Sequence, residues 1–476
     1  MTIVFIALTL VLIIAGLTNR KHQFGGALFL LFAFAQVAFL IHLYINKDVE
    51  MLGLFKPDAI SLVFAGVQTV LAFIYYFFST RFLKEYPPKS NSGRYYYPAS
   101  ILLFAAMLLA LISSHIAATW IFVELTTLSA SVLIYHNRDA VALEGTWKYL
   151  FVCSISIAVV FIGILFASVA IQGIPGVDMT YENFETYAKK LDPFWLKISF
   201  LFVFTGFTSK AGLFPMFTAG VDAKDSAPSP AGAILSSGVL NMGFVGIYRF
   251  YCIIDGTDYK EWADLIMMAS ALISILVATV YMIRVKNIKR MLAYSSIEHA
   301  GIAMLGVIMG PVGQLFAVLH LVLHSFAKSF FFFHTKRLIK TYGTKSIYDY
   351  GGYFEINPQG SAVLLLGFFW LAALPPSGLF FTEIMIFKSL FDGGRIITLV
   401  FVASMLTVII WAFARNIIKI LFTKPVFNEH HNISFEKSKP IEWITEIVLF
   451  IVLFIIGIMP PSFLMDLIKE SVNVIQ

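Results

Sequence analysis

Long runs of apolar residues, separated by short polar links, recur from one end of the sequence to the other. A helix needs about 20 apolar residues to cross the hydrocarbon core of a bilayer. Of all residues, 59% are hydrophobic and 13% are charged, whereas soluble domains are about half apolar and a quarter charged, so lipid must surround most of this chain. We therefore expect an all-α polytopic membrane protein. The sequence predicts about fourteen membrane-spanning helices, near residues 3–18, 25–46, 57–82, 97–112, 115–135, 147–172, 195–220, 229–253, 262–284, 291–310, 313–335, 361–390, 397–422 and 442–463.

Basic residues gather in alternate links between these apolar runs. In membrane proteins, lysine and arginine concentrate in the loops that stay on the cytoplasmic side. Two even-numbered links, near residues 173–194 and 254–261, lean acidic instead. We therefore expect a multi-pass protein of the cell (inner) membrane, with both termini on the non-cytoplasmic side. The basic residues of the odd-numbered links are Arg20, Lys21, Arg81, Lys84, Lys89, Arg94, Arg284, Lys286, Lys289, Arg290, Lys336, Arg337, Lys340, Lys345, Lys424, Lys437 and Lys439.

The polar stretches are too short to form a separate soluble domain. The sequence contains no Walker motif and no GxGxxG loop, which argues against transport driven directly by ATP. Cys153 and Cys252 lie in apolar stretches and are interpreted as small core residues. We expect no flavin, iron–sulfur, haem or metal cofactor, because no ligand set for one is evident. The net charge of +6 comes from the basic loops, so we also expect no nucleic-acid partner.

Two charged residues interrupt otherwise apolar spans in the first half of the sequence. Glu124 lies in TWIFVELTTLSASVLIY, where a carboxylate must pair or be protonated for part of its life. Lys210 comes five residues before Pro215, which should break the span and free backbone carbonyls. A buried lysine beside such a break can gain and lose a proton. We predict proton transfer for both residues; the alternatives are a structural ion pair for Glu124 and a snorkelling lysine near a helix end for Lys210.

A row of three titratable residues follows in the second half. His320, His324 and Lys328 are spaced by four in AVLHLVLHSFAKSFFFF, which places them along one face of a helix. Imidazoles both donate and accept hydrogen bonds and titrate near neutral pH, so the row suits a proton relay. Two histidines at this spacing can also ligate zinc, but a third ligand is missing and a lysine is a poor neighbour for a cation. Histidines satisfied within the core are a further alternative.

A second proline-broken span carries a buried carboxylate. Glu383 follows Pro375 and Pro376 in WLAALPPSGLFFTEIMIFK, and we predict proton transfer there too, with a structural ion pair as the alternative. Each broken span is fourth in a run of about five spans, and paired broken spans of this kind indicate duplicated transporter halves. The sequence therefore predicts two related halves, each with its own ionisable site.

Two further pairs are possible accessory groups. Glu298 and His299 are adjacent in YSSIEHAGIAMLG and are either a buried functional pair or a helix-end cap. Glu144 and Lys148 are spaced four apart in LEGTWKYLF, at the opening of a span. That spacing also suits an ordinary surface ion pair on a helix, so both interpretations stay open.

At these residues the sequence resembles a known family, the antiporter-like membrane subunits shared by respiratory complex I, Mrp-type sodium/proton antiporters and membrane-bound hydrogenases. The matching segments are WIFVELTTLSA, SKAGLFPMF with the APSP stretch, NIKRMLAYSSI, HLVLHSFAKSFFFF and LPPSGLFFTE, in order from about residue 97 to 390. LEGTWKYLFVCS and YSSIEHAGI are most similar to the F-type subunit of hydrogenase-4 and formate hydrogenlyase complexes.

The resemblance implies two inverted five-helix repeats, each containing a proline-broken helix. The domains would be N-terminal helices 1–3 at residues 1–96, the first repeat at 97–260, the second repeat at 261–423 and a C-terminal helix at 424–476. It also implies residue roles: Glu124 and Lys210 as the pair of the first half-channel, Glu383 as the terminal group of the second, and His320, His324 and Lys328 as the central relay.

The sequence departs from the family pattern at two places. Ser236 stands where complex I subunits have a histidine or lysine after the PSP/PTP segment. Lys224, in VDAKD, stands in the place of the histidine of an LPDAH-like stretch. Lys224 and Ser236 are thus possible accessory residues, and water or another residue must bridge the first half-channel to the relay.

The resemblance predicts a proton-translocating subunit of a larger redox-driven complex, similar to hydrogenase-4 or complex I. Its partners would be other membrane and peripheral subunits, the lipid bilayer, and protons or sodium ions. One alternative is a subunit of an Mrp-like sodium/proton antiporter. Another is the membrane subunit of an inorganic-carbon uptake system that works with a soluble zinc protein.

Overall fold

A computed structural model describes residues 1–19, 22–87, 92–424 and 440–472, and these residues form helices and no β-strand. Arg20, Lys21, Lys89, Lys437 and Lys439, which the predicted orientation uses, lie outside the described residues. The chain divides into two compact units, Met1–Ile266 and Met267–Gln476, with the boundary inside α12. The fold is therefore all-helical, as the hydrophobic pattern predicts.

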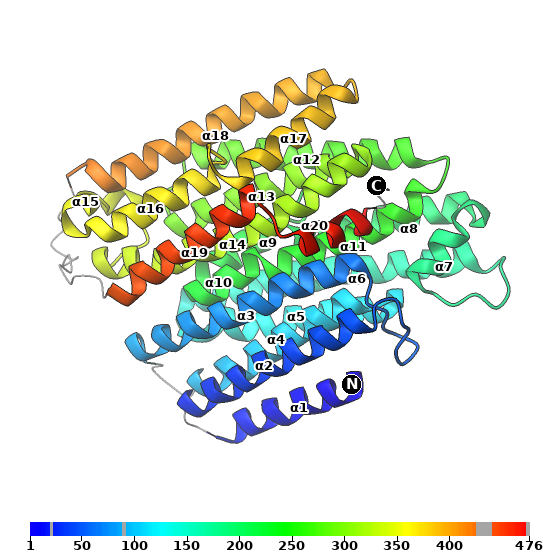
Figure 1. Cartoon of the computed structure of the whole chain (residues 1–476), viewed down its shortest axis with the longest axis horizontal. Helices are drawn as coiled ribbons and strands as arrows, with labels where there is room; N and C mark the ends of the chain where they lie inside the picture. The colour runs from blue at the N-terminus through cyan, green and yellow to red at the C-terminus, as the bar shows by residue number, and fades with distance from the viewer. Residues whose placement is uncertain (20–21, 88–91, 425–439, 473–476) are drawn as a thin grey trace. The chain divides into compact units, whose positions relative to one another are not determined.

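The α-helices of each unit are labelled in Figure 1. The first unit contains α1 (Thr2–Thr18), α2 (His22–Ile45), α3 (Ala59–Glu85), α4 (Ser92–Ile112), α5 (Ile116–Ile134), η1 (Tyr135–Asn137), α6 (Ala140–Ile171), α7 (Tyr181–Thr186), η2 (Ala188–Lys190), α8 (Pro193–Ala211), α9 (Thr218–Ser226), α10 (Ser229–Ser236), α11 (Gly238–Asp255) and the start of α12 (Lys260–Ile283). The second contains the rest of α12, α13 (Ile288–Val307), α14 (Gly310–Tyr342), η3 (Ile347–Asp349), α15 (Tyr353–Ile356), α16 (Pro358–Leu371), α17 (Gly378–Asp392), α18 (Ile396–Phe422), α19 (Pro440–Ile458) and α20 (Ser462–Ser471).

Each of the predicted spans falls on one of these helices or on two consecutive ones. In the described part of the chain, nine helices are long and apolar enough to cross a membrane, or ten if the bent pair α19 and α20 forms one span. Helices α1 and α16 are apolar but shorter. A membrane protein with many helical spans is thus confirmed, while the count of about fourteen spans remains a prediction.

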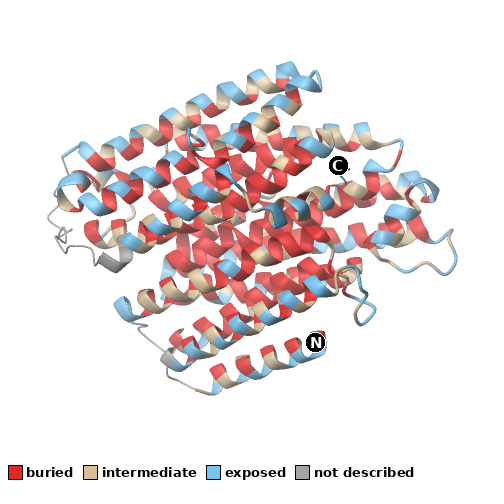
Figure 2. Cartoon of the chain, in the orientation of Figure 1, coloured by how far each residue is buried: buried red, intermediate tan, exposed pale blue. Residues whose placement is uncertain are grey.

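The exposed surface of the long helices is apolar, as contact with lipid requires. On α18, large apolar side chains such as Ile397, Val400 and Phe422 are exposed, whereas α13 and α14 are buried along most of their length (Figure 2). A long helix that exposes this many large apolar side chains is typical of a membrane protein. Helices α13 and α14 carry His299, His320, His324 and Lys328, and protein surrounds these side chains.

A buried arginine joins three helices of the first unit. Arg249 on α11 donates to both carboxylate oxygens of Asp58, the residue that caps α3, and to the hydroxyl of Ser61. It also donates to the backbone carbonyls of Leu111 and Ser113 at the end of α4. Because these donors and acceptors are satisfied together, the arginine can be buried without an unpaired charge.

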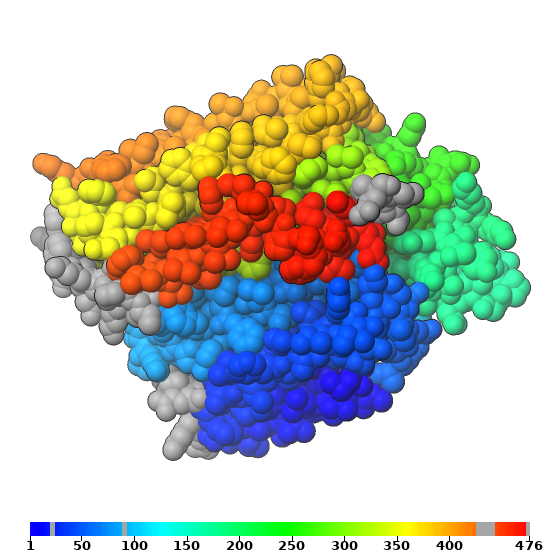
Figure 3. Space-filling model, viewed as in Figure 1, coloured from blue at the N-terminus to red at the C-terminus, as the bar shows by residue number. Residues whose placement is uncertain are grey.

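In the second unit, the long helix α14 is surrounded by α13, α16, α17 and α19. Figure 3 shows α19, in orange-red, alongside α16, in yellow. His334 on α14 and Glu446 on α19 are both almost fully buried, and His334 Nδ1 lies 3.1 Å from Glu446 Oε2. This contact connects the C-terminal helix to the helix that bears the predicted relay.

Candidate functional site

Lys210 lies in the last turn of α8, directly before the predicted break. Gly212 has φ +75°, and its N–H and that of Leu213 both donate to the carbonyl oxygen of Thr208, which ends the helix. The next helix, α9, begins only at Thr218. The C-terminal end of a helix carries partial negative charge, so it favours an ammonium group. A helix break therefore lies where the sequence predicts one, and the C-terminal end of α8 stabilises the lysine.

The ammonium group of Lys210 points into the first unit. Only 4% of the residue is exposed. Its Nζ donates to Thr127 Oγ1 on α5 at 2.7 Å and to the hydroxyl of Tyr149 on α6 at 3.3 Å. A snorkelling lysine would extend toward the membrane surface. Lys210 instead hydrogen-bonds inside the helix bundle, which argues against the snorkelling alternative.

Glu124 is connected to Lys210 through a hydroxyl group. Thr127 Oγ1 donates to Glu124 Oε2 at 3.4 Å, and Ser154 Oγ on α6 donates to Glu124 Oε1 at 3.0 Å. Glu124 is half-buried. Among the described residues no direct ion pair joins Glu124 to Lys210. The structure therefore brings the predicted pair together, but with Thr127 between the two charges.

Close helix packing positions Tyr149 beside Lys210. A Cβ added at Gly206 of α8 would lie 2.4 Å from the carbonyl oxygen of Ser156 on α6. One added at Gly163 of α6 would lie 2.7 Å from Cγ2 of Val203 on α8. Glycines thus let the two backbones touch, as small residues do in membrane helix pairs.

The accessory residues of the first unit occupy two environments. Lys148 lies 2.6 Å from Glu144 and 3.9 Å from Asp222, with the Lys148 side chain 51% exposed and that of Glu144 65% exposed. Lys224 and Ser236 are buried, and Ser236 Oγ has no hydrogen-bond partner among the described residues. Glu144 and Lys148 therefore form a surface pair in this chain, and the roles of all four residues remain predictions.

In the second unit, a histidine from a neighbouring helix joins the predicted row. His320, His324 and Lys328 all lie on α14 and are fully buried. His299 on α13 approaches both histidines, with ring centroids 5.1 Å from His320 and 4.9 Å from His324. His299, expected only as an accessory residue, is therefore placed to connect the two imidazoles of α14.

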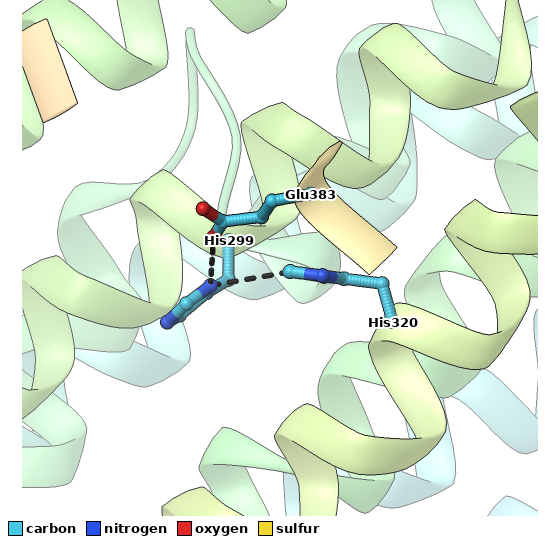
Figure 4. Close-up of side chains that lie close together, drawn as sticks. All are labelled: His299, His320 and Glu383. Atoms are coloured by element: carbon cyan, nitrogen blue, oxygen red, sulfur yellow. Dashed lines mark hydrogen bonds and ion pairs between the residues drawn. The ribbon is translucent and has the colours of Figure 1, made fainter. Parts of the chain in front are cut away.

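The histidine contacts are direct. His299 Nδ1 lies 3.1 Å from His320 Nε2 (Figure 4). On its other side, His299 Nε2 donates to the carbonyl oxygen of Leu371 at 3.1 Å, and His320 Nδ1 lies 2.9 Å from Thr382 Oγ1. Leu371 is the last residue of α16, and the final carbonyls of a helix lack intrahelical partners. The second helix break thus supplies the acceptor that orients His299.

Glu383 meets the cluster through His299. It lies on α17, beyond the break, and its Oε1 is 3.7 Å from His299 Nδ1. Glu383 is 6% exposed, and Oε1 has no hydrogen-bond partner among the described residues. Lys388, five residues after Glu383 on the same helix, pairs with Asp392 at 2.5 Å on the exposed surface.

Glu298 and Lys328 extend the charged cluster. Glu298 is buried in the middle of α13, so the helix-end cap considered as its alternative is wrong. It interacts electrostatically with Lys328 and with Glu383. The Lys328 ammonium group donates to the carbonyl oxygen of Leu292 at 3.0 Å. The cluster therefore contains two carboxylates and one ammonium group besides its imidazoles.

Sequence reasoning missed the hydroxyl groups that connect these sites. Thr127 is three residues after Glu124, one helical turn away, and Thr382 directly precedes Glu383. A hydroxyl within one turn of a buried carboxylate is the signal that could have indicated them. The contact of His334 with Glu446 had no such signal, because the two residues are far apart in the sequence.

Both clusters can pass protons in principle, since their hydroxyl and imidazole groups donate and accept hydrogen bonds. The ligand atoms of His299, His320 and Glu383 also lie within 4.8 Å of one another, close enough to hold one metal ion. The three residues come from α13, α14 and α17, so only the fold brings them together.

The family described as NADH:quinone oxidoreductase/Mrp antiporter, TM, matches residues 113–409. That range covers more than half of the chain and contains Glu124, Lys210, the histidine cluster and Glu383. Among curated relatives, a hydrogenase-4 component F homolog of Methylacidiphilum infernorum (isolate V4) is 28% identical over 85% of this chain and 86% of its own length.

Solved structures share the fold. A chain of the membrane-bound sulfane sulfur reductase (MBS), an archaeal respiratory membrane complex, superposes with a TM-score of 0.85 at 21% identity, over 98% of this chain and 96% of that one. A chain of the Mrp complex from Dietzia sp. DQ12-45-1b gives a TM-score of 0.81 at 15% identity, over 99% and 97%. At these identities the likeness shows the fold alone.

Proposed function

This chain belongs to the NADH:quinone oxidoreductase/Mrp antiporter membrane family, and from that membership we propose that it conducts protons as one subunit of a larger redox-driven complex. It is an antiporter-like membrane subunit, and its relatives belong to multisubunit complexes. The hydrogenase-4 relative supports a complex of the hydrogenase type. The driving redox chemistry would take place in partner subunits, and this chain would respond to it.

The hydrogen-bonded series Lys210–Thr127–Glu124 is the observation that carries the proposal. Its members lie among apolar helices at 2.7 and 3.4 Å spacing. A hydroxyl can accept a proton from the ammonium group while it releases its own proton to the carboxylate. Thr127 can therefore transfer a proton and still be a neutral hydroxyl afterwards. Ionisable side chains cost free energy inside a membrane protein. A connected series of them is therefore interpreted as a functional site.

In the second unit, the proposed route uses His299 as well as the predicted row. The imidazoles of His299 and His320 are in contact, and His324 faces His299 from one turn further along α14. Each ring can take up a proton on one nitrogen and release one from the other. We assign proton release to Glu383, which lies against His299 beyond the helix break.

The two helix breaks also support the finer architecture. We propose about fourteen spans, in two inverted repeats that each contain one broken span. The odd-numbered links would face the cytoplasm and both termini the opposite side. The proposed domains are residues 1–96, 97–260, 261–423 and 424–476.

An Mrp-like exchange of sodium for protons is the second candidate. Oε2 of Glu298 and Oε1 of Glu383 are buried and have no hydrogen-bond partner among the described residues. Carboxylate oxygens are ligands for hard cations. If sodium binds there, transport would depend on sodium even when the redox reaction is saturated.

The test is proton uptake by proteoliposomes that contain the whole native complex, with redox turnover recorded alongside. Lys210→Ala should reduce proton uptake per electron by about 100-fold, the scale of a lost acid–base group. Lys388→Ala is the matched control, because Lys388 is an exposed lysine in a surface ion pair.

Normal uptake in Lys210→Ala, with the complex assembled, would refute the proposed role. Repeating the assay without sodium separates the candidates: uptake that persists supports proton conduction, and uptake that disappears supports exchange.

A further inference from the structure

Three potential ligand atoms converge at one point in the second unit. His299 Nδ1 lies 3.1 Å from His320 Nε2 and 3.7 Å from Glu383 Oε1. In Figure 4 both dashed lines meet at the same nitrogen of His299, and the three side chains come from three helices. All three residues are more than nine-tenths buried.

The hydrogen bonds that His299 and His320 make to Leu371 and Thr382 determine which of their ring nitrogens carry a hydrogen. A carbonyl oxygen only accepts, so His299 Nε2 carries the hydrogen that it donates to Leu371. Thr382 Oγ1 lies 2.9 Å from the carbonyl oxygen of Leu379 and so donates its hydroxyl hydrogen there. Thr382 must then accept from His320 Nδ1–H. The assignment leaves unshared electron pairs on His299 Nδ1 and His320 Nε2, the two nitrogens that face each other.

Two electron pairs at 3.1 Å repel unless a cation lies between them. The carboxylate oxygen of Glu383, which has no hydrogen-bond partner among the described residues, faces the same point. In proton conduction, one proton shared between the two nitrogens can remove this repulsion. The same arrangement of electron pairs also suits a metal ion.

We propose that His299, His320 and Glu383 form a binding site for a divalent transition-metal ion of the Zn²⁺ class. A tetrahedral Zn²⁺ with bonds of about 2.0–2.1 Å has ligand atoms roughly 3.3 Å apart. The distances of 3.1 and 3.7 Å lie on either side of that value. Three protein ligands would leave a fourth position for water.

The surroundings fit such an ion. Histidines that bind metals usually donate their other ring N–H to a carbonyl or a similar acceptor, as both histidines do here. Imidazole ligands favour zinc-like ions over magnesium or calcium. Lys328 is the opposing positive charge, and Glu298 offsets it electrostatically.

A bound ion would occupy the nitrogens that the proposed relay uses. Binding to the protonated cluster would release the shared proton, and conduction through this unit would stop while the ion stays. This consequence rests on the proposed function, whereas metal binding itself does not.

The binding test uses the full-length chain, purified without a histidine tag and stripped of metal, with Co²⁺ as the probe. Tetrahedral Co²⁺ absorbs visible light strongly, and Zn²⁺ should displace it. We expect Glu383→Gln to weaken Co²⁺ binding by more than about 100-fold, and Thr382→Val, which removes only the acceptor for His320, by about 10–100-fold.

His334→Gln is the matched control, since it removes a second buried histidine–carboxylate contact, which offers two ligand atoms. It should leave the Co²⁺ affinity unchanged. If Glu383→Gln does not fold, judged by gel filtration, then Thr382→Val and Glu383→Asp carry the test.

No tetrahedral Co²⁺ spectrum in the wild type, or unchanged binding in both Glu383→Gln and Thr382→Val, would overturn the site. Zn²⁺ is then added to proteoliposomes holding the whole complex. If Co²⁺ binds as expected but Zn²⁺ leaves proton uptake intact, the metal site stands and the proposed relay through His299 and His320 fails.

Discussion

The two clusters differ in how they hold ionisable side chains among apolar helices. In the first unit, hydroxyl groups separate the charges, and Glu124 is half-buried. In the second, His299 and His320 touch directly and are fully buried. The breaks differ as well: the first leaves Lys210 at a helix end, and the second frees the Leu371 carbonyl for His299. A broken helix can therefore either stabilise a charge or orient a neutral ring.

Among the variants that test this comparison, the largest effect on conduction is expected where two imidazoles meet without a hydroxyl between them. His320→Gln keeps the approximate size of the side chain but removes the group that can be protonated. Proton uptake per electron by the whole complex in proteoliposomes should fall by about 100-fold.

His334→Gln serves as its control, because His334 lies on the same helix outside the cluster. Equal losses in the two variants would mean that any buried histidine of α14 matters for folding, and the contrast between the clusters would disappear.

A smaller loss is expected at the hydroxyl bridge. Thr127→Val retains the shape of the side chain but removes the oxygen between Lys210 and Glu124. Uptake should fall by about tenfold, because water can replace part of a hydroxyl bridge. Thr127→Ser, which keeps the hydroxyl, should restore most of it.

Glu124→Gln tests the same bridge through a double-mutant cycle. If Thr127 acts only by linking Glu124 to Lys210, combining Thr127→Val with Glu124→Gln should cost less than the sum of the single losses. Fully additive losses would show that the hydroxyl serves something other than this link.

The sequence predicts helices and single buried charges better than it predicts contacts. Apolar runs and prolines are local signals, so the helices and both breaks could be located. The pairing of Glu124 with Lys210 was predicted only from the family resemblance. The resemblance does not predict that the hydroxyl of Thr127 lies between them. The role of His299 depends on packing between α13 and α14, which no spacing rule within one helix specifies. The convergence of His299 and Glu383 on His320 was missing from the local motif for the same reason.

Loosening the packing between α6 and α8 should reduce conduction less than removing the Thr127 hydroxyl does. Gly206→Ala puts a Cβ against the backbone of Ser156, and overpacking of this kind costs about 1–3 kcal/mol. The helices should separate slightly, moving Tyr149 away from Lys210. We expect a lower thermal midpoint and a loss of uptake smaller than that of Thr127→Val.

Gly66→Ala is the control for this change, because a Cβ there meets nothing within 4 Å. It should leave the midpoint unchanged or raise it, since alanine favours a helix over glycine by up to about 1 kcal/mol. A midpoint lowered equally in both variants would show that the close approach at Gly206 is not what matters.

The smallest effect is expected at the surface pair of the first unit. Lys148 and Glu144 are more than half exposed, and an exposed ion pair contributes at most about 1 kcal/mol. Lys148→Ala should therefore leave proton uptake and the thermal midpoint nearly unchanged. Lys388→Ala is a close match in the second unit, because Lys388 and Asp392 form an exposed pair with the same spacing of four. If Lys148→Ala reduced uptake while Lys388→Ala did not, the surface pair would belong to proton entry into the first unit. Exposure alone would then be a poor guide to function, because a charge that faces outward in this chain could meet a partner subunit in the complex.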